Sequence, residues 1–225
     1  MRILFLILLL AAATAHAESH EELVERAFDA LANDIHEQWS FTETTSNSDG
    51  TFVATHDPQR DEKWQLLSVD GREPTQKELD DFLADKSGDS DSGGDDRESM
   101  VADGSLELLE DTDDYFLFSF SPRVGDEEDK AFMDSVRGRL KVIKDGPYVA
   151  ELKLENDGPI KPGKGVKIKT FRTHLQFAPV EEGGPVLIQS VDVEVKGRAM
   201  LVVGFDEQES VRFTNYRWAD SAHSP

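Results

Sequence analysis

Five histidines downstream of residue 17 are the side chains best suited to acid–base catalysis or metal binding. No two of them lie four residues apart, which is the spacing that puts two zinc ligands on one face of a helix. His36 and Glu37 begin like a zinc-protease motif, but the second histidine of that motif is absent. The sequence has no cysteine, which excludes a thiolate nucleophile, a thiolate metal site and a disulfide. We therefore expect no metal centre built on these residues.

Motifs of other enzyme classes are missing as well. There is no Gly-x-Ser-x-Gly elbow, no phosphate-binding glycine loop and no dinucleotide fingerprint. The run Asp91-Ser92-Gly93-Gly94 is similar to the nucleophile motif of trypsin-like proteases, but Ser90 stands where that motif has glycine. A hydrolase with two carboxylates stays open, because 46 acidic residues offer many pairs and only separation in space could select one. We expect a protein without catalytic activity and without a cofactor.

Serine, glycine and aspartate dominate one segment, Ser87 to Glu98, which contains no apolar residue. Such a segment cannot bury enough surface to offset the entropy of ordering, so we expect a disordered acidic loop at 87–98. Asp89 and Asp91 have the spacing of the first two ligands of a calcium loop. Gly93 takes the place of the third ligand, and Met100 takes that of the bidentate glutamate. Asp89 and Asp91 are therefore only weak candidates for Ca²⁺ ligands, and the other interpretation is a solvated loop.

Charge and the N-terminal residues restrict the partners and the location. With 46 acidic and 24 basic residues the net charge is -22, so we expect no face that binds nucleic acid.

Residues 1–17 have the pattern of a signal peptide. It consists of Arg2, the apolar run Ile3–Ala13 and the cleavage site Ala15-His16-Ala17. The run is shorter than the ~20 residues that a transmembrane helix needs. We expect an exported monomer in the periplasm, or secreted beyond it, with only transient contact to a membrane or a lipoprotein.

Two capping boxes predict where helices begin. Ser19 and Glu22 begin an amphipathic helix, and apolar residues then recur at helical spacing as far as Ile35. Thr75 and Glu78 begin a second, short helix. The apolar stripe of each helix must be buried against another element.

The rest of the chain has the pattern of short strands separated by turns. Phe116, Phe118 and Phe120 alternate with other residues and must share one face of a strand. Asp145-Gly146 is a strong hairpin signal, and a third helix is expected over 126–136. Connections this short leave no room for βαβ crossovers, so the sheet should be antiparallel. The expected strands are 39–41, 51–55, 63–69, 106–108, 116–120, 140–144, 148–155, 166–177, 186–195, 199–206 and 210–218.

A sheet of about eleven strands must curl, and its apolar face needs cover. We therefore expect an α+β fold, in which a curled antiparallel half-barrel carries helices on its concave face. The whole of 18–225 should form this single domain.

The order of elements resembles the LolA/LolB-like superfamily of periplasmic lipoprotein carriers and sensors. The matching features are a signal peptide, an N-terminal helix, three strands with Trp39 and Trp64, a helix near 74–85, and a long meander that ends in Val211–Arg217. The resemblance implies a concave apolar cavity that holds acyl chains or another hydrophobic ligand, and it implies no catalysis.

Two groups of side chains are candidates for binding. Aromatic residues on strands could line a hydrophobic cavity, although such residues more often form an ordinary core; they are Trp64, Phe116, Phe118, Phe120, Phe171 and Phe177. A basic island could dock an anionic head group or an acidic partner, although lysine on an edge strand also prevents aggregation; its residues are Lys161, Lys164, Lys167 and Lys169.

The function that we expect is the binding of a hydrophobic molecule, an acyl chain or a lipidated protein in the concavity of the sheet. The alternative is a periplasmic interaction or sensory module. Such a module would have a core filled by its own side chains and an acidic surface that binds a partner or cations.

Overall fold

The structure is a computed structural model, and it describes residues 19–32, 35–88, 100–123, 130–163, 165–199 and 203–219. The predicted signal peptide lies outside the described residues. So do residues 89–98 of the acidic segment, with the weak calcium candidates Asp89 and Asp91, and Lys164 of the basic island.

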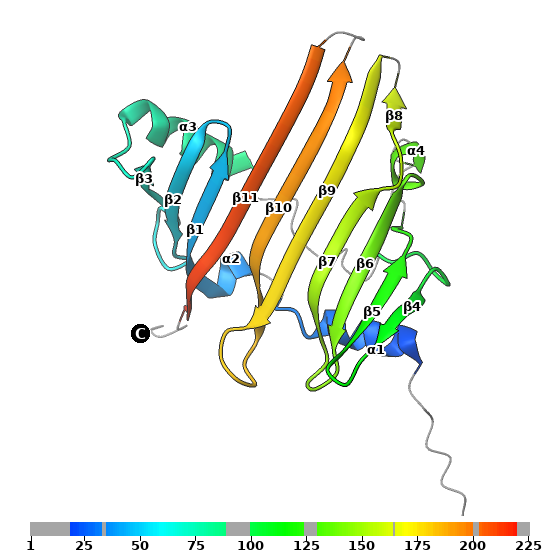
Figure 1. The fold of residues 1–225 in the computed structure, drawn as a ribbon. Helices are drawn as coiled ribbons and strands as arrows, with labels where there is room; N and C mark the ends of the chain where they lie inside the picture. The colour runs from blue at the N-terminus through cyan, green and yellow to red at the C-terminus, as the bar shows by residue number, and fades with distance from the viewer. Residues whose placement is uncertain are drawn as a thin grey trace, which may run out of the picture.

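Within these residues the chain is mostly β, with four short helices and eleven strands (Figure 1). The helices are α1 His20–Asp29, α2 Ile35–Gln38, α3 Gln76–Gly88 and α4 Lys130–Met133. The strands are β1 Trp39–Asn47, β2 Gly50–His56, β3 Trp64–Val69, β4 Glu107–Asp111, β5 Tyr115–Phe120, β6 Val136–Ile143, β7 Tyr148–Asn156, β8 Ile160–Gly163, β9 Val166–Pro179, β10 Val186–Ala199 and β11 Val203–Trp218.

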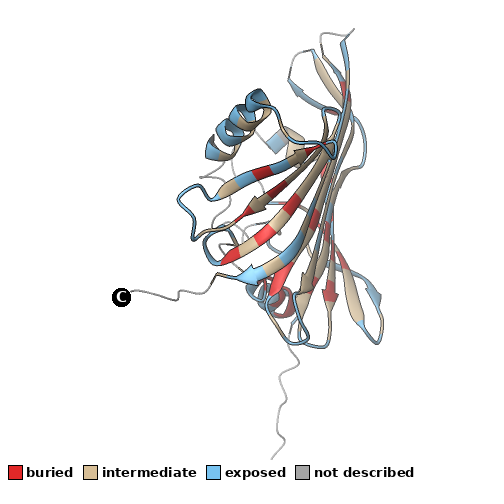
Figure 2. Cartoon of the chain, turned by 90° about the vertical axis from the view of Figure 1, so that its left-hand side faces the viewer, coloured by how far each residue is buried: buried red, intermediate tan, exposed pale blue. Residues whose placement is uncertain are grey.

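All of these strands belong to one antiparallel sheet. Its order is β3-β2-β1-β11-β10-β9-β7-β6-β5-β4, and β8 pairs with β9 beside this path. The predicted antiparallel sheet and its number of strands are thus confirmed, although β11 covers two of the expected strands and β8 was not expected. The sheet is neither closed nor strongly curled, however, so the expected half-barrel is observed as an open sheet with edges at β3 and β4 (Figures 1 and 2).

The two faces of the sheet differ in polarity. Directly paired residues share a face, and one row of such pairs crosses ten strands. The row is Leu108, Phe118, Leu140, Leu152, Leu175, Val191, Val211, Thr45, Phe52 and Val69. Only Thr45 in this row is polar. We call this side of the sheet the helix-bearing face and the other side the polar face.

The helices pack on the helix-bearing face, and Figure 2 shows α1 and α3 on the same side of the sheet. Helix α1 buries its apolar stripe against Phe118, Leu140 and Leu152. Helix α3 packs Leu79 and Phe82 over β2 and β3. Burial of these stripes removes apolar surface from water, which is the main force that holds each helix to the sheet.

Both predicted capping boxes are present. The Ser19 backbone N–H donates to Glu22 at 2.8 Å, and the Glu22 N–H donates back to the Ser19 hydroxyl at 3.2 Å. Helix α1 ends at Asp29 instead of continuing to Ile35, because the following chain bonds to the sheet. The Ala32 N–H donates to the Val186 carbonyl at 2.9 Å, and this bond replaces another helical turn.

The predicted helix over 126–136 ends earlier than expected. Its described part, α4, ends at Met133. Helix α4 is described over Lys130–Met133, and residues 124–129 lie outside the described residues. Val136, which we placed in the helix, begins β6 and is fully buried there. Pairing with Asn156 of β7 fixes it in the sheet.

The strands at the C-terminal end are longer than the sequence indicated. Lys196-Gly197 was expected to be a turn, but it lies inside β10, which continues to Ala199. The expected strands 199–206 and 210–218 required a turn near Asp206-Glu207-Gln208, but these residues lie inside β11, so residues 203–218 form one strand.

The physical reason is a cross-strand contact in which Phe205 lies directly opposite Gly197 and covers it. A Cβ atom added to Gly197 would come within 2.3 Å of Phe205 Cζ. The ring therefore supplies the packing that the glycine lacks and keeps the strands paired. The same arrangement recurs where Phe120 of β5 lies opposite Gly138 of β6.

Candidate functional site

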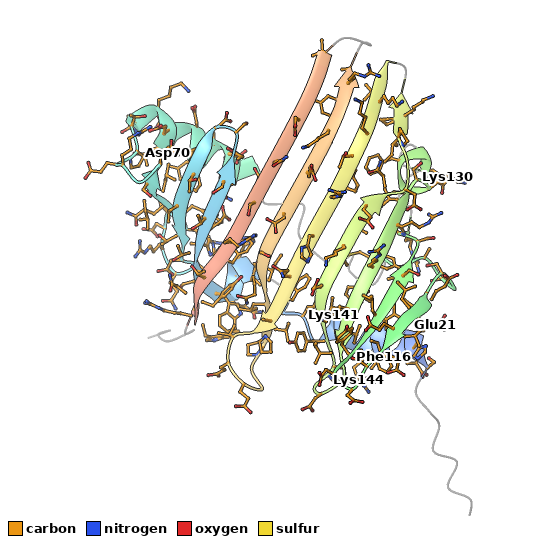
Figure 3. The ribbon with its side chains drawn as sticks, in the orientation of Figure 1. Glu21, Asp70, Phe116, Lys130, Lys141 and Lys144 are labelled. Carbon is orange, nitrogen blue, oxygen red and sulfur yellow. The ribbon has the colours of Figure 1, made fainter. Side chains whose placement is uncertain are left out.

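The predicted aromatic candidates lie on the helix-bearing face, but they do not form one group. Phe118 and Phe120 are buried beneath α1 in the main core cluster, as the strict alternation of the three phenylalanines predicted. Phe116 lies at the margin of this cluster, where the Lys144 ammonium stands 4.2 Å above its ring (Figure 3). Phe177 packs against the same cluster.

Phe171 and Trp64 lie elsewhere on this face. Phe171 contacts Phe132 of α4, with ring centroids 5.0 Å apart. Trp64 belongs to an aromatic cluster at the β1–β3 end of this face, beneath α3, together with Phe41 and Phe82. The helix-bearing face thus has several separate aromatic contacts.

A charged pair lies beside Trp64. Lys86 at the end of α3 places its ammonium 2.8 Å from Glu43 Oε1 and 4.4 Å above the Trp64 ring. Glu43 is buried, at 6% exposed, so the ammonium partner compensates for the loss of hydration of its carboxylate. This contact joins α3 to the sheet at β1, and the sequence contained no signal for it because the two residues are distant in the chain.

His56 lies next to this pair and is buried. Its Nδ1 is 3.2 Å from the Trp39 carbonyl oxygen, and its ring stacks on Phe41. Burial lowers the pKa of His56 to about 4, although the hydrogen bond to the Trp39 carbonyl acts in the opposite direction. The Trp39 indole N–H has no hydrogen-bond partner among the described residues. His56 is therefore neutral at neutral pH and suited to packing.

The basic island lies at the far end of the sheet from α1. Lys161 is on β8, and Lys167 and Lys169 are on β9. Figure 1 shows β8 at the opposite end of the strands from α1, so these lysines do not border the Phe116–Phe120 group. None of the three forms an ion pair with another described residue within 4.0 Å.

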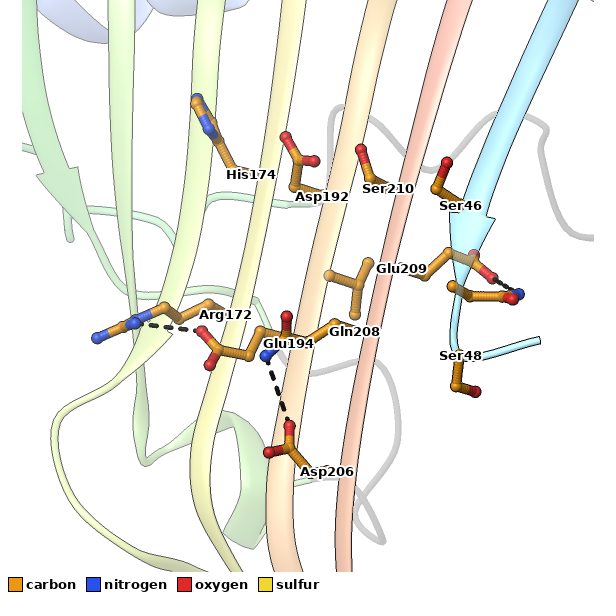
Figure 4. A pocket seen from close by; sticks show the side chains of 12 residues that line it. Ser46, Ser48, Arg172, His174, Asp192, Glu194, Asp206, Gln208, Glu209 and Ser210 are labelled. Atoms are coloured by element: carbon orange, nitrogen blue, oxygen red, sulfur yellow. Dashed lines mark hydrogen bonds and ion pairs between the residues drawn. The ribbon is translucent and has the colours of Figure 1, made fainter. Parts of the chain in front are cut away.

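A groove of about 740 Å³ lies on the polar face, where no candidate had been placed (Figure 4). Its lining comes from the end of the β1–β2 hairpin and from β9, β10 and β11. The residues are Ser46, Asn47, Ser48, Arg172, His174, Asp192, Val193, Glu194, Asp206, Gln208, Glu209 and Ser210. The only sequence signal for this site was the alternation of polar residues along these strands.

One row of this groove contains residue types found in hydrolases. His174, Asp192 and Ser210 lie on neighbouring strands and are directly paired. His174 Nε2 is 3.2 Å from Glu151 Oε2. Burial acts to raise the pKa of Asp192, but hydrogen bonds from Arg212 and Ser210 outweigh it, and the net shift is downward.

The order of these side chains does not suit a Ser-His-Asp triad. In a triad the histidine stands between serine and carboxylate and removes the serine proton. Here Asp192 stands between His174 and Ser210, and the serine bonds to the carboxylate. A carboxylate with a lowered pKa is a poor base, so this row favours a structural role.

A second row of the groove consists of paired charges. Arg172 donates to Glu194 at 3.2 Å, and Lys196 lies 3.0 Å from Glu194 and 3.4 Å from Asp206. The hydrogen bond from Lys196 is the largest cause of a lowered pKa at Glu194. These pairs are partly or largely exposed, so each stabilises the sheet only slightly.

No group of three or more metal-binding side chains occurs among the described residues. Within the same residues, no helix is long and apolar enough to cross a membrane.

Comparisons with known proteins add little to this geometry. No family model matches the chain, and no curated protein matches its sequence. Among solved structures, a variant of the GphF dehydratase made for improved crystallization is similar at 10% identity. That alignment covers 88% of this chain and 82% of the dehydratase, with a TM-score of 0.18. Such a score supports no conclusion on fold or function.

Proposed function

We propose that this chain is an exported, non-enzymatic binding protein that holds a hydrophobic molecule, an acyl chain or a lipidated protein against its helix-bearing face. The observation that carries the proposal is the apolar row that crosses ten strands of the sheet. The apolar face of an antiparallel sheet has to be covered, and the described helices cover only part of this row.

The distribution of the described helices supports this assignment. The contacts of α1 centre on β7, whereas those of α2 and α3 centre on β1 and β3. Between these two regions β9, β10 and β11 bring Leu175, Val191 and Val211 to the same face, and all three are only partly buried. A ligand with an aliphatic chain would gain about 25 cal/mol for each Å² of apolar surface removed from water there.

The finer features of the proposal come from the sequence. The resemblance to the lipoprotein carriers implies a half-barrel. In that arrangement the helix-bearing face would be the concave side, and the sheet would curl around its ligand. The predicted signal peptide makes the protein periplasmic, or secreted beyond the periplasm. The net charge of -22 disfavours nucleic acid as a partner and favours a monomer with only transient contact to membranes or lipoproteins.

The absence of catalysis remains part of the proposal. The row of His174, Asp192 and Ser210 supports it, because its order does not activate the serine. The paired charges of the second row support it as well, since each cation already has a carboxylate partner.

One observation favours the alternative of an interaction or sensory module. Phe118, Phe120 and Leu140 are at most 2% exposed beneath α1, so that part of the helix-bearing face is filled by the protein itself. In this alternative the acidic surface binds a partner or cations, and the apolar row is entirely core.

Native mass spectrometry of the mature protein from its own host, followed by lipid extraction, separates the two functions. Binding of a fluorescent fatty acid to the delipidated protein gives a second measurement. A co-purified acyl ligand in a one-to-one ratio supports the carrier function. A protein that is empty and takes up no fatty acid rules it out.

A matched pair of variants locates the ligand. Val191→Glu places a charge on the helix-bearing face of β10, within the apolar row, and should abolish fatty-acid binding. Thr214→Glu adds the same charge to the polar face of β11 and should leave binding unchanged. Circular dichroism of both variants shows whether the sheet still forms. Equal binding by both folded variants would place the ligand away from this face.

A further inference from the structure

Strand β11 is longer than β1, the strand that pairs with it on one side. Its last pairing with β1 is Ser46 opposite Ser210, and residues 203–209 continue beyond this point. On the other side these residues remain paired with β10, from Val203 opposite Ala199 to Glu209 opposite Val193. No strand among the described parts of the chain pairs with their outer side, and Figure 1 shows β11 rising past β1 and β2. We call residues 203–209 the free edge.

The free edge exposes backbone groups that can form hydrogen bonds. Successive residues of a strand direct their N–H and C=O groups alternately to the two sides. Every second residue of the free edge therefore directs both groups away from β10. Such a row is a template to which another extended segment can add as a strand. The segment contains neither lysine nor proline, the residues that often prevent such pairing.

The groove on the polar face borders the free edge. Asp206, Gln208 and Glu209 of the edge form one part of its lining, and the end of the β1–β2 hairpin forms another (Figure 4). Asn47 of the hairpin donates to Glu209 Oε2 at 3.4 Å, at the inner corner between β1 and the edge. An added strand would therefore lie beside a recess that can receive one of its side chains. Pairing through the backbone gives affinity in such complexes, and recesses for alternate side chains give specificity.

Charge indicates what kind of segment would fit. The free edge carries Asp206, Glu207 and Glu209, and only Asp206 has a lysine partner. Glu194 of the groove is already shared between Arg172 and Lys196. Asp206 lies on the polar side of the edge, and Glu207 and Glu209 lie on its helix-bearing side. Lysine or arginine side chains on either side of an added strand would therefore lie close to a carboxylate.

A second copy of this chain is a poor occupant of the same place. If two free edges paired about a twofold axis through their central residue, Asp206 would face Asp206. Each chain also has a net charge of -22, so long-range repulsion opposes their approach.

We propose that residues 203–209 of β11 form a docking site for an extended, lysine- or arginine-containing segment of another protein. The segment adds as a strand next to β11, and one of its basic side chains enters the groove on the polar face. The groove and Asp206 are on the polar face, separate from the binding face proposed above, whereas Glu207 and Glu209 lie on the helix-bearing side of the edge.

Fluorescence anisotropy with synthetic peptides tests the proposal on the mature protein. The probe is a labelled peptide of about eight residues, the length that covers the free edge, with alternating lysine and valine. We expect it to bind, and we expect a peptide with the same side chains but N-methylated alternate amides to bind roughly tenfold more weakly. A peptide of alternating glutamate and valine should not bind. Equal affinity of the methylated and unmethylated peptides would show that no strand is added and would overturn the proposal.

Charge-reversal variants locate the peptide. Asp206→Lys and Glu207→Lys should each weaken binding roughly tenfold. The matched control is Glu107→Lys, which makes the same change of charge on the exposed edge strand β4. If all three variants weaken binding equally, the peptide responds to net charge alone and the site is not the free edge. Fatty-acid binding by Asp206→Lys stays normal if the two sites are separate, so failure of one proposal does not affect the other.

Discussion

The contact between Phe120 and Gly138 allows a sharp test of how the core is packed. Gly138→Ala adds one methyl group at a position where the new Cβ would lie 2.2 Å from Phe120 Cζ. Carbon atoms in contact normally lie at about 3.5–4.0 Å, so the ring or the strand must move by more than about 1 Å. The ring cannot turn away freely, because Phe120 is 2% exposed beneath α1.

Overpacking of this kind costs about 1–3 kcal/mol. For a chain of this size we expect the melting temperature to fall by about 2–12 °C, since each kcal/mol corresponds to about 2–4 °C. Urea unfolding followed by tryptophan fluorescence gives the free energy directly. The control is Gly158→Ala, because no atom lies within 4 Å of a Cβ at that glycine. If both variants lose the same stability, the packing argument is refuted.

A double variant separates the clash from other effects of the new methyl group. Phe120→Ala removes the ring and is itself destabilising, by about 3–5 kcal/mol. In that background, Gly138→Ala should cost almost nothing, because the space is empty. The coupling energy between the two sites should therefore be at least about 1 kcal/mol. Strict additivity would mean that the ring does not restrict Gly138.

Three further predictions concern other contacts. As the pH falls from 6.5 toward 4, the unfolded chain takes up a proton at His56 that the folded chain does not accept, because burial lowers the pKa of His56 to about 4. Stability should fall by up to about 1.4 kcal/mol per pH unit in that window, and His56→Phe should remove this part of the slope in urea titrations. Lys86→Met leaves the Glu43 carboxylate buried without its cation and should cost about 3–5 kcal/mol, whereas Glu43→Gln combined with Lys86→Met should cost clearly less in the same assay. Ser19→Ala removes the cap of α1 and should cost about 1 kcal/mol in thermal unfolding, with no change in far-ultraviolet circular dichroism at low temperature.

Local patterns in the sequence predicted those parts of the fold that depend on neighbouring residues. The capping boxes at Ser19 and Thr75 both form, because each needs only residues three positions apart. Asp145 and Gly146 lie in the loop that joins β6 to β7, as expected, and Gly146 has a positive φ of 63°, which glycine adopts without strain. The alternation of three phenylalanines correctly placed them on one face.

Interactions between distant residues were not predictable in the same way. Gly197 is typical of a turn in isolation, and only the ring of Phe205 on the next strand makes it part of β10. The groove on the polar face needs the order of four strands, which no local pattern contains. The prediction of a strongly curled sheet was wrong for a similar reason. The number of strands alone does not determine how far a sheet bends.

The pairing of β1 with β11 has a consequence for how the protein folds. Thr42 and Asn215, which are 173 residues apart, bond to each other across this pair. In the described sheet β11 is the only strand that joins β1, β2 and β3 to the other strands. The sheet therefore cannot be completed until the last strand is present, and a high contact order of this kind slows folding. A chain shortened at its C-terminus would leave the first three strands without a partner, so nearly the entire polypeptide must be available before the native state becomes accessible.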